Sequence, residues 1–177
     1  MSRLDSAFST VVTALSNPLI AAGVLVGTVV LGAAGLLAAR RWGWRPVPSV
    51  LAGISLGVVL GVTLSRTRPD WMHVYAVEGP FCHLTGFSMV GGSELMNVLL
   101  FMPLAFFAVL ATRRPLPVAV AAVGLSVLIE LVQSWTERGV CETRDLLNNS
   151  VGAVVAVGVA ALLRSLTDDR VSPGRTR

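Results

Sequence analysis

Carboxylate and amide side chains recur at helical spacing near the ends of three hydrophobic runs of this sequence. Glu130 and Gln133 are three residues apart and Asp145 and Asn149 are four apart, so each pair shares one face of a helix, while Asn97 stands near the start of another run. A charged side chain in hydrocarbon costs roughly 2.5–3.5 kcal/mol on insertion scales, so it normally faces protein or a water-filled cavity. The pattern predicts either a buried hydrogen-bond network or a site for a polar ligand.

The composition indicates an integral membrane protein. Of the 177 residues, 54% are hydrophobic and only 14% are charged, which is too apolar for a soluble domain of this length. The fourteen basic residues are all arginines, and they flank the hydrophobic runs instead of forming a basic face, so we expect no nucleic-acid partner. Five stretches approach the length of about 20 residues that a helix needs to span a bilayer. They lie at about 18–39, 47–64, 95–112, 116–135 and 146–163.

Arginine placement predicts the orientation of these spans. With the N-terminus outside, nine of the fourteen arginines fall in cytoplasmic segments and five in outer segments, which agrees with the positive-inside rule. The sequence therefore predicts an all-α polytopic helix bundle of about five transmembrane helices, N-out and C-in. Its expected parts are an interfacial N-terminal segment, two packing helices, an outer loop, a three-helix core and a disordered cytoplasmic tail. They cover residues 1–16, 17–64, 65–93, 94–166 and 167–177, in that order.

Within the first two spans, glycines are spaced for close helix packing. Gly53, Gly57 and Gly61 form one stripe of small residues, and Gly23 with Gly27 form a second. Such stripes let helix backbones approach closely in lipid. We expect contacts within one bundle, and the oligomeric state stays open.

This topology brings the polar residues of the last three spans to one depth at the outer surface. Glu130 then lies inside the end of its helix, and we expect Arg138, Arg144, Asn97 and Asn149 as its partners. An alternative stays open, in which Glu130 only locks three helices together while Asp145 and Asn148 cap the last one.

Three motifs in this region resemble the VanZ-like family of small bacterial membrane proteins, named for a teicoplanin-resistance protein. They are ELMNVLLFMPLAFF at 94–107, IELVQ at 129–133 and DLLNNSVGA at 145–153, with Arg138 in the place of the family's isolated arginine. Ala105 stands where the family usually has glycine, and Ser150 replaces threonine. The resemblance implies a multi-pass protein of the bacterial cytoplasmic membrane that is associated with reduced glycopeptide susceptibility.

The residues and the resemblance together favour binding or modulation of a cell-envelope lipid or peptidoglycan precursor at the outer face. The arginines suit phosphate or carboxylate groups, and the carboxylate and amides suit amine, amide or sugar groups. The expected ligand-binding residues are Asn97, Glu130, Gln133, Arg138, Arg144, Asp145 and Asn149. Three alternatives are a membrane enzyme acting on a lipid head group, with Glu130 as acid or base, a purely structural helix bundle and a small transporter.

Other kinds of site have weaker support in the sequence. An enzyme usually has a nucleophile beside a base or a phosphate loop, and neither pattern is visible, so a binding protein is favoured over an enzyme. His73, Cys82 and His83 lack the paired spacing of a zinc site, and we expect no metal and no cofactor.

Cys82 and Cys141 are the two cysteines of the chain, and both fall in predicted outer loops. Because the outer face is oxidising, we expect a disulfide between them, which would tie the loop 65–93 over the polar cluster as a lid. Two unlinked thiols in flexible loops are the alternative.

Overall fold

The computed structural model describes residues 3–67 and 81–171. Five helices are long and apolar enough to cross a membrane, so the chain is a multi-pass membrane protein with the predicted all-α fold. They are α2 (Pro18–Trp42), α3 (Pro46–Leu64), α5 (Gly92–Thr112), α6 (Pro115–Trp135) and α7 (Thr143–Val171). Large apolar side chains such as Leu25, 66% exposed, and Leu162, 60% exposed, cover the outside of the bundle. These surfaces suit lipid rather than water.

Local sequence signals account for several of the helix ends. The Asn17 side chain accepts a hydrogen bond from Leu19 N at 3.0 Å and caps the start of α2, where Pro18 occupies the first turn. Gly43 ends α2 in the left-handed conformation, with a φ of 68°. Pro46 and Pro115 begin α3 and α6 after short connections.

The N-terminal segment and the last span differ most from the sequence prediction. The N-terminal segment forms a helix of 14 residues, α1 (Arg3–Ser16). α7 begins at Thr143 and continues to Val171, past the predicted start of the tail at residue 167. No proline or glycine interrupts the sequence between Gly158 and Pro173, so the helix has no local signal to stop at the predicted boundary. Residues 172–177 of the predicted tail lie outside the described residues.

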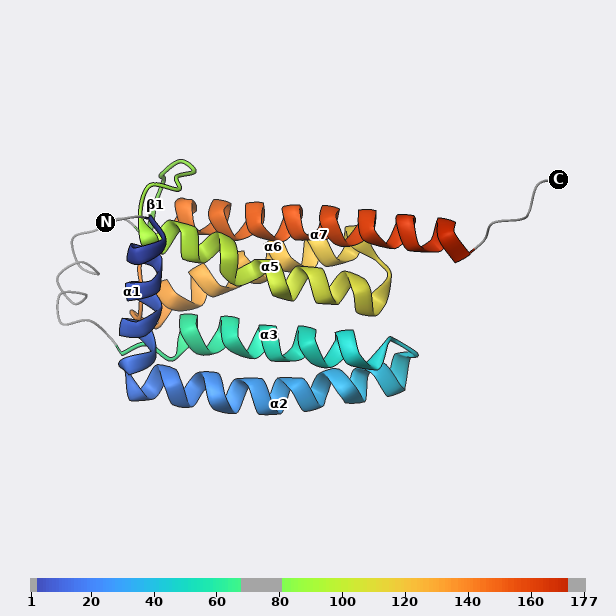
Figure 1. The fold of residues 1–177 in the computed structure, drawn as a ribbon. Helices are drawn as coiled ribbons and strands as arrows, with labels where there is room; N and C mark the ends of the chain where they lie inside the picture. The colour runs from blue at the N-terminus through green and yellow to red at the C-terminus, as the bar shows by residue number, and fades with distance from the viewer. Residues whose placement is uncertain (1–2, 68–80, 172–177) are drawn as a thin grey trace.

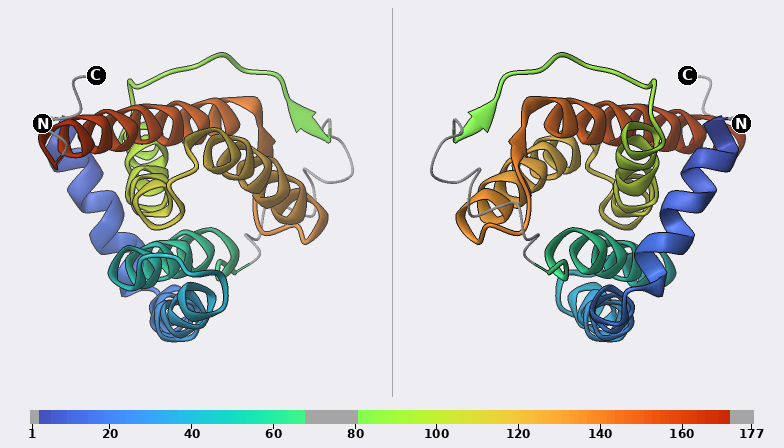
Figure 2. Two further views of the ribbon diagram at one scale, coloured as in Figure 1. Left: turned by 90° about the vertical axis from the view of Figure 1, so that its right-hand side faces the viewer. Right: turned by 90° about the vertical axis from the view of Figure 1, so that its left-hand side faces the viewer.

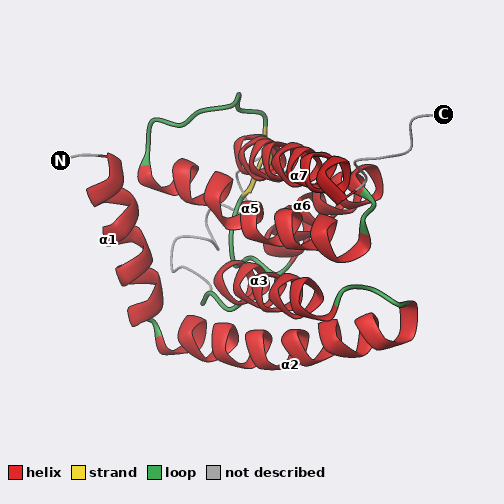
Figure 3. Cartoon of the chain, turned by 45° about the vertical axis from the view of Figure 1, so that its right-hand side comes forward, coloured by secondary structure: helices red, strands yellow, loops and turns green. Residues whose placement is uncertain are grey.

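Two short strands and α1 gather at one end of the bundle (Figure 1). Strand β1 (Cys82–His83) pairs in parallel with β2 (Cys141–Glu142), with Cys82 opposite Cys141. The predicted disulfide joins these two cysteines, whose Cα atoms are 4.6 Å apart. We call this end, where α2, α5 and α7 begin and α3 and α6 end, the disulfide end. α1 lies across it at a steep angle to the spans, and Figure 3 shows both strands at the same end.

The five spans are not packed equally. Viewed along the bundle in Figure 2, α3, α5, α6 and α7 surround the interior, whereas α2 lies outside α3. Close backbone contact holds α2 to α3, because a Cβ added at Gly27 would lie 2.9 Å from Gly57 O. The glycine stripes therefore pack within one chain, as predicted.

The hydrophobic core fills the space between α3, α5, α6 and α7. Phe101, Val59 and Val109 are fully buried in it, and Ile129 is nearly so. Gly152 of α7 lies so close to α5 that an added Cβ would collide with the Val98 carbonyl oxygen. Phe101 and Gly152, both part of the family-like motifs, thus serve packing.

A candidate polar binding cavity at the disulfide end

A cavity of about 400 Å³ lies at the disulfide end, between α3, α5, α6, α7 and the segment 138–142. Residues far apart in the sequence meet there because α3 and α6 end and α5 and α7 begin at this level. All seven residues that the sequence suggested for ligand binding line it: Asn97, Glu130, Gln133, Arg138, Arg144, Asp145 and Asn149. The cavity is also lined by Thr63, Arg66, Thr67, Ser93, Glu94, Ile129, Gly139, Val140 and Glu142.

Glu130 is the most deeply buried carboxylate of the cavity, with 5% of the residue exposed. Its Oε2 accepts a hydrogen bond from the backbone N–H of Glu142 at 3.1 Å. The sequence predicted that Glu130 would bind Arg138, Arg144, Asn97 and Asn149. That prediction is wrong for this hydrogen bond, whose donor is the backbone N–H of Glu142. The reason is that β2 brings a backbone donor to the carboxylate, while both arginines bind elsewhere.

Two side chains on the α6 side of the cavity bind the carbonyl end of α3. Gln133, 7% exposed, donates from Nε2 to Thr63 O at 2.9 Å, and Arg138 donates from Nη1 to Leu64 O at 2.9 Å. The last carbonyls of a helix lack partners within the helix and carry partial negative charge, so an amide and a guanidinium both stabilise them. Arg138 is exposed, and its other N–H groups can reach a ligand.

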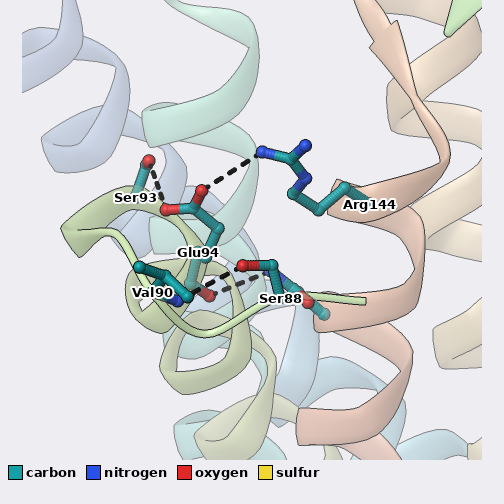
Figure 4. Close-up of polar contacts among 6 residues, drawn as sticks. Ser88, Val90, Ser93, Glu94 and Arg144 are labelled. Carbon is teal, nitrogen blue, oxygen red and sulfur yellow. Dashed lines mark hydrogen bonds and ion pairs between the residues drawn. The ribbon is translucent and has the colours of Figure 1, made fainter. Parts of the chain in front are cut away.

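Arg144 and Glu94 form an ion pair across the cavity wall (Figure 4). The distance from Arg144 Nη1 to Glu94 Oε1 is 3.3 Å, and Ser93 Oγ donates to the other carboxylate oxygen at 3.0 Å. Asn148, which the sequence suggested as a helix cap, is fully buried and donates from Nδ2 to Glu94 O at 3.3 Å. These contacts fix the start of α5 against the first two turns of α7.

Asn149 lines the cavity and carries a buried polar atom without a partner in the described part of the chain. Its Nδ2 donates to Ser126 Oγ of α6 at 3.0 Å, and the residue is 3% exposed. Its Oδ1 is buried without a hydrogen-bond partner among the described residues. A buried carbonyl oxygen without a hydrogen bond costs free energy.

Charged groups of both signs line the cavity. Glu130 lies near the carboxylates of Glu142 and Asp145, whose negative charges repel it, and near the compensating charge of Arg66. Asp145 in turn faces the Asn97 amide. Three carboxylates so close together favour a cation beside them, while the arginines favour an anion.

The model of the VanZ/LLP1 family matches residues 56–164, which is more than half of the chain. The chain belongs to the VanZ/LLP1 family. Comparison with curated proteins found no match, and comparison with solved structures found none. Every residue that lines the cavity falls within the VanZ/LLP1 match, whereas α1, α2 and the first part of α3 precede it.

Several lining residues of this VanZ/LLP1 protein were missed as site residues from the sequence. Arg66 and Thr67 directly follow α3, which carries none of the quoted motifs. The available signal was that Arg66 and Thr67, like Glu130, were predicted to lie at the outer surface of the membrane. Glu142 was overlooked because its contribution to Glu130 comes from its backbone, which no side-chain pattern reveals.

Residues 81–91 of the predicted outer loop do not cover the cavity, although Arg66, Thr67 and Ser93 of the same loop line it. None of residues 81–91 lines it, because β1 pairs with β2 and Thr85 N donates to Thr143 Oγ1 at 2.7 Å. For residues 81–91 the predicted lid is wrong, and residues 68–80 lie outside the described residues.

Within residues 3–67 and 81–171, no group of three potential metal ligands comes together, and His73 lies outside these ranges.

Proposed function

We propose that this VanZ/LLP1 protein binds the polar head of a membrane lipid or lipid-linked peptidoglycan precursor at the outer face of the bacterial cytoplasmic membrane. The observation that carries the proposal is a cavity at one end of the spans that is lined by three arginines and four carboxylates. A structural helix bundle has no need to keep such a set of charges around an open volume, because buried charges cost free energy unless they are paired.

The charge pattern selects a head group that bears both signs. Guanidinium groups of Arg66 and Arg138 suit a phosphate or carboxylate, since they offer several N–H donors in one plane. The carboxylates around Glu130 suit an ammonium group. We therefore assign the ligand class as a zwitterionic head group, with its anion toward the arginines and its cation toward Glu130.

The orientation of the cavity toward the outside is part of the proposal. It is supported by the arginine distribution and by the disulfide at the same end, since disulfides form and persist on the oxidising side of the membrane. Glycopeptides act on precursors at that face. A protein that holds a lipid-linked head group there would lower the access of teicoplanin to its target.

A binding experiment tests the role of Glu130. Native mass spectrometry would compare binding of dioleoylphosphatidylethanolamine to the wild-type protein and to the Glu130→Gln and Glu137→Gln variants in one detergent. Glu137 does not line the cavity, so Glu137→Gln is the matched control. A hydrogen bond to a charged group contributes about 1.5–3 kcal/mol, so Glu130→Gln should weaken binding by about ten- to a hundredfold. Equal affinity of the two variants would refute the proposed site.

A susceptibility experiment tests the cellular consequence. Cells that make the wild-type protein, Glu130→Gln, Glu137→Gln or no protein would be compared for the inhibitory concentration of teicoplanin at equal membrane abundance. We expect Glu137→Gln to match wild type and Glu130→Gln to match cells without the protein. Conversion of the bound lipid to a new product in either experiment would support the enzymatic alternative instead.

A further inference from the structure

A second cavity, of about 320 Å³, lies between α1, α2, α3 and α5. Eight of its eleven lining residues are apolar, and they come from all four helices. Representative members are Val11 and Ala14 of α1, Val24 of α2, Val58 of α3 and Leu100 of α5. We call this volume the apolar groove.

The apolar groove adjoins the polar cavity. Arg66, Ser93 and Asn97 line both volumes, and they supply the three polar residues of the groove. A ligand that reaches from one volume into the other therefore meets charges at one end and hydrocarbon side chains at the other. This is the polarity profile of a lipid at the boundary between its head group and its chains.

The position of α1 agrees with that boundary. α1 lies across the disulfide end, at a steep angle to the spans, and contacts both α2 and α5 (Figures 1 and 2). Val11 faces the groove while its neighbour Val12, 51% exposed, does not line it. A short helix with one apolar face toward the bundle, lying across the ends of the spans, matches the head-group level of a bilayer.

We propose that the apolar groove holds the first part of a hydrocarbon chain of the ligand whose head occupies the polar cavity. This inference rests on the proposed function and narrows it. The ligand is an amphiphile taken from the membrane, and its chain contributes to affinity together with its head group. A water-soluble peptide or sugar fragment of a precursor would leave the groove unfilled.

The test compares two adjacent substitutions on α1, Val11→Trp in the groove and Val12→Trp on the exposed face. Each variant and the wild type would be titrated with dioleoylphosphatidylethanolamine and with glycerophosphoethanolamine, which has the same head group and no chains. Binding would be measured by native mass spectrometry. Burial of two methylene groups corresponds to about a tenfold change in affinity, so wild type should prefer the dioleoyl lipid by at least about tenfold.

The two proposals fail in different ways. We expect Val11→Trp to lose the preference for the dioleoyl lipid but keep the affinity for glycerophosphoethanolamine, and Val12→Trp to behave as wild type. Equal behaviour of the two tryptophan variants, with binding still sensitive to Glu130→Gln, would overturn the groove and keep the proposed head-group site. Binding of the dioleoyl lipid that is sensitive to Val11→Trp but not to Glu130→Gln would overturn the head-group site and keep the groove.

Discussion

The backbone N–H of Glu142 lies 3.1 Å from Glu130 Oε2 and donates a hydrogen bond to it. Glu142 belongs to β2, and the preceding residue, Cys141, is joined covalently to Cys82 of β1. The disulfide therefore holds the strand that orients the most buried carboxylate of the cavity. A covalent bond outside the cavity thus supports a contact inside it.

Removal of the disulfide should destabilise the protein. The bridge spans 59 residues, and in the chain-entropy model a loop of this length contributes about 4 kcal/mol. The Cys82→Ser, Cys141→Ser double variant should unfold at a lower temperature than wild type in the same detergent. Dithiothreitol should lower the unfolding temperature of wild type and leave that of the variant unchanged. Equal unfolding temperatures for oxidised wild type and variant would contradict the prediction.

Two glycines of α7 should respond oppositely to alanine. A Cβ at Gly152 would collide with Val98 O, whereas a Cβ at Gly158 meets nothing within 4 Å. Overpacking costs about 1–3 kcal/mol, so Gly152→Ala should lower the unfolding temperature and the amount of protein in the membrane. Gly158→Ala should be neutral or stabilise by up to about 1 kcal/mol, because alanine favours a helix. Equal effects of the two substitutions would contradict the close packing of α5 and α7.

The coupling free energy between Glu94 and Arg144 should be small. The Arg144 side chain is 34% exposed, so solvent and salt screen the pair. A double-mutant cycle with Glu94→Gln and Arg144→Gln should give a coupling free energy of about 0.2–1 kcal/mol that falls as salt is added. A larger coupling that is insensitive to salt would show that the pair behaves as a buried one.

The predicted orientation can be tested with single introduced thiols, because the native cysteines are bonded to each other. Thr136 and Arg114 are both exposed and lie at opposite ends of α6. A membrane-impermeant maleimide should label Thr136→Cys in intact cells and Arg114→Cys only after the membrane is permeabilised. The reverse pattern would place the polar cavity on the cytoplasmic side.

Hydropathy and arginine placement were sufficient to predict the five spans and the disulfide. A span needs only length and apolar composition, and the pairing of Cys82 with Cys141 followed from the presence of two cysteines at one predicted surface. The grouping of Asn97, Glu130 and Asp145 followed in the same way, since helices of similar length place their ends at two levels.

The detailed contacts could not be predicted from the sequence. Two-residue strands such as β2 carry no periodic signal, so the bond from Glu142 N to Glu130 depends on tertiary structure alone. Arg138 was expected beside Glu130, but the carbonyl end of α3 is an equally good partner for a guanidinium. The choice depends on how closely α3 and α6 approach, which helix patterns do not specify.

The glycine contact between α2 and α3 has a consequence for the order of assembly during synthesis. Both helices leave the ribosome before any later span, and their backbones pack on each other directly, so this hairpin can mature in the membrane on its own. The polar cavity, by contrast, needs residues from Thr63 to Asn149 and can close only when the start of α7 has emerged. The hairpin can therefore form early in translation, and the polar cavity is completed only when α7 packs against the other helices.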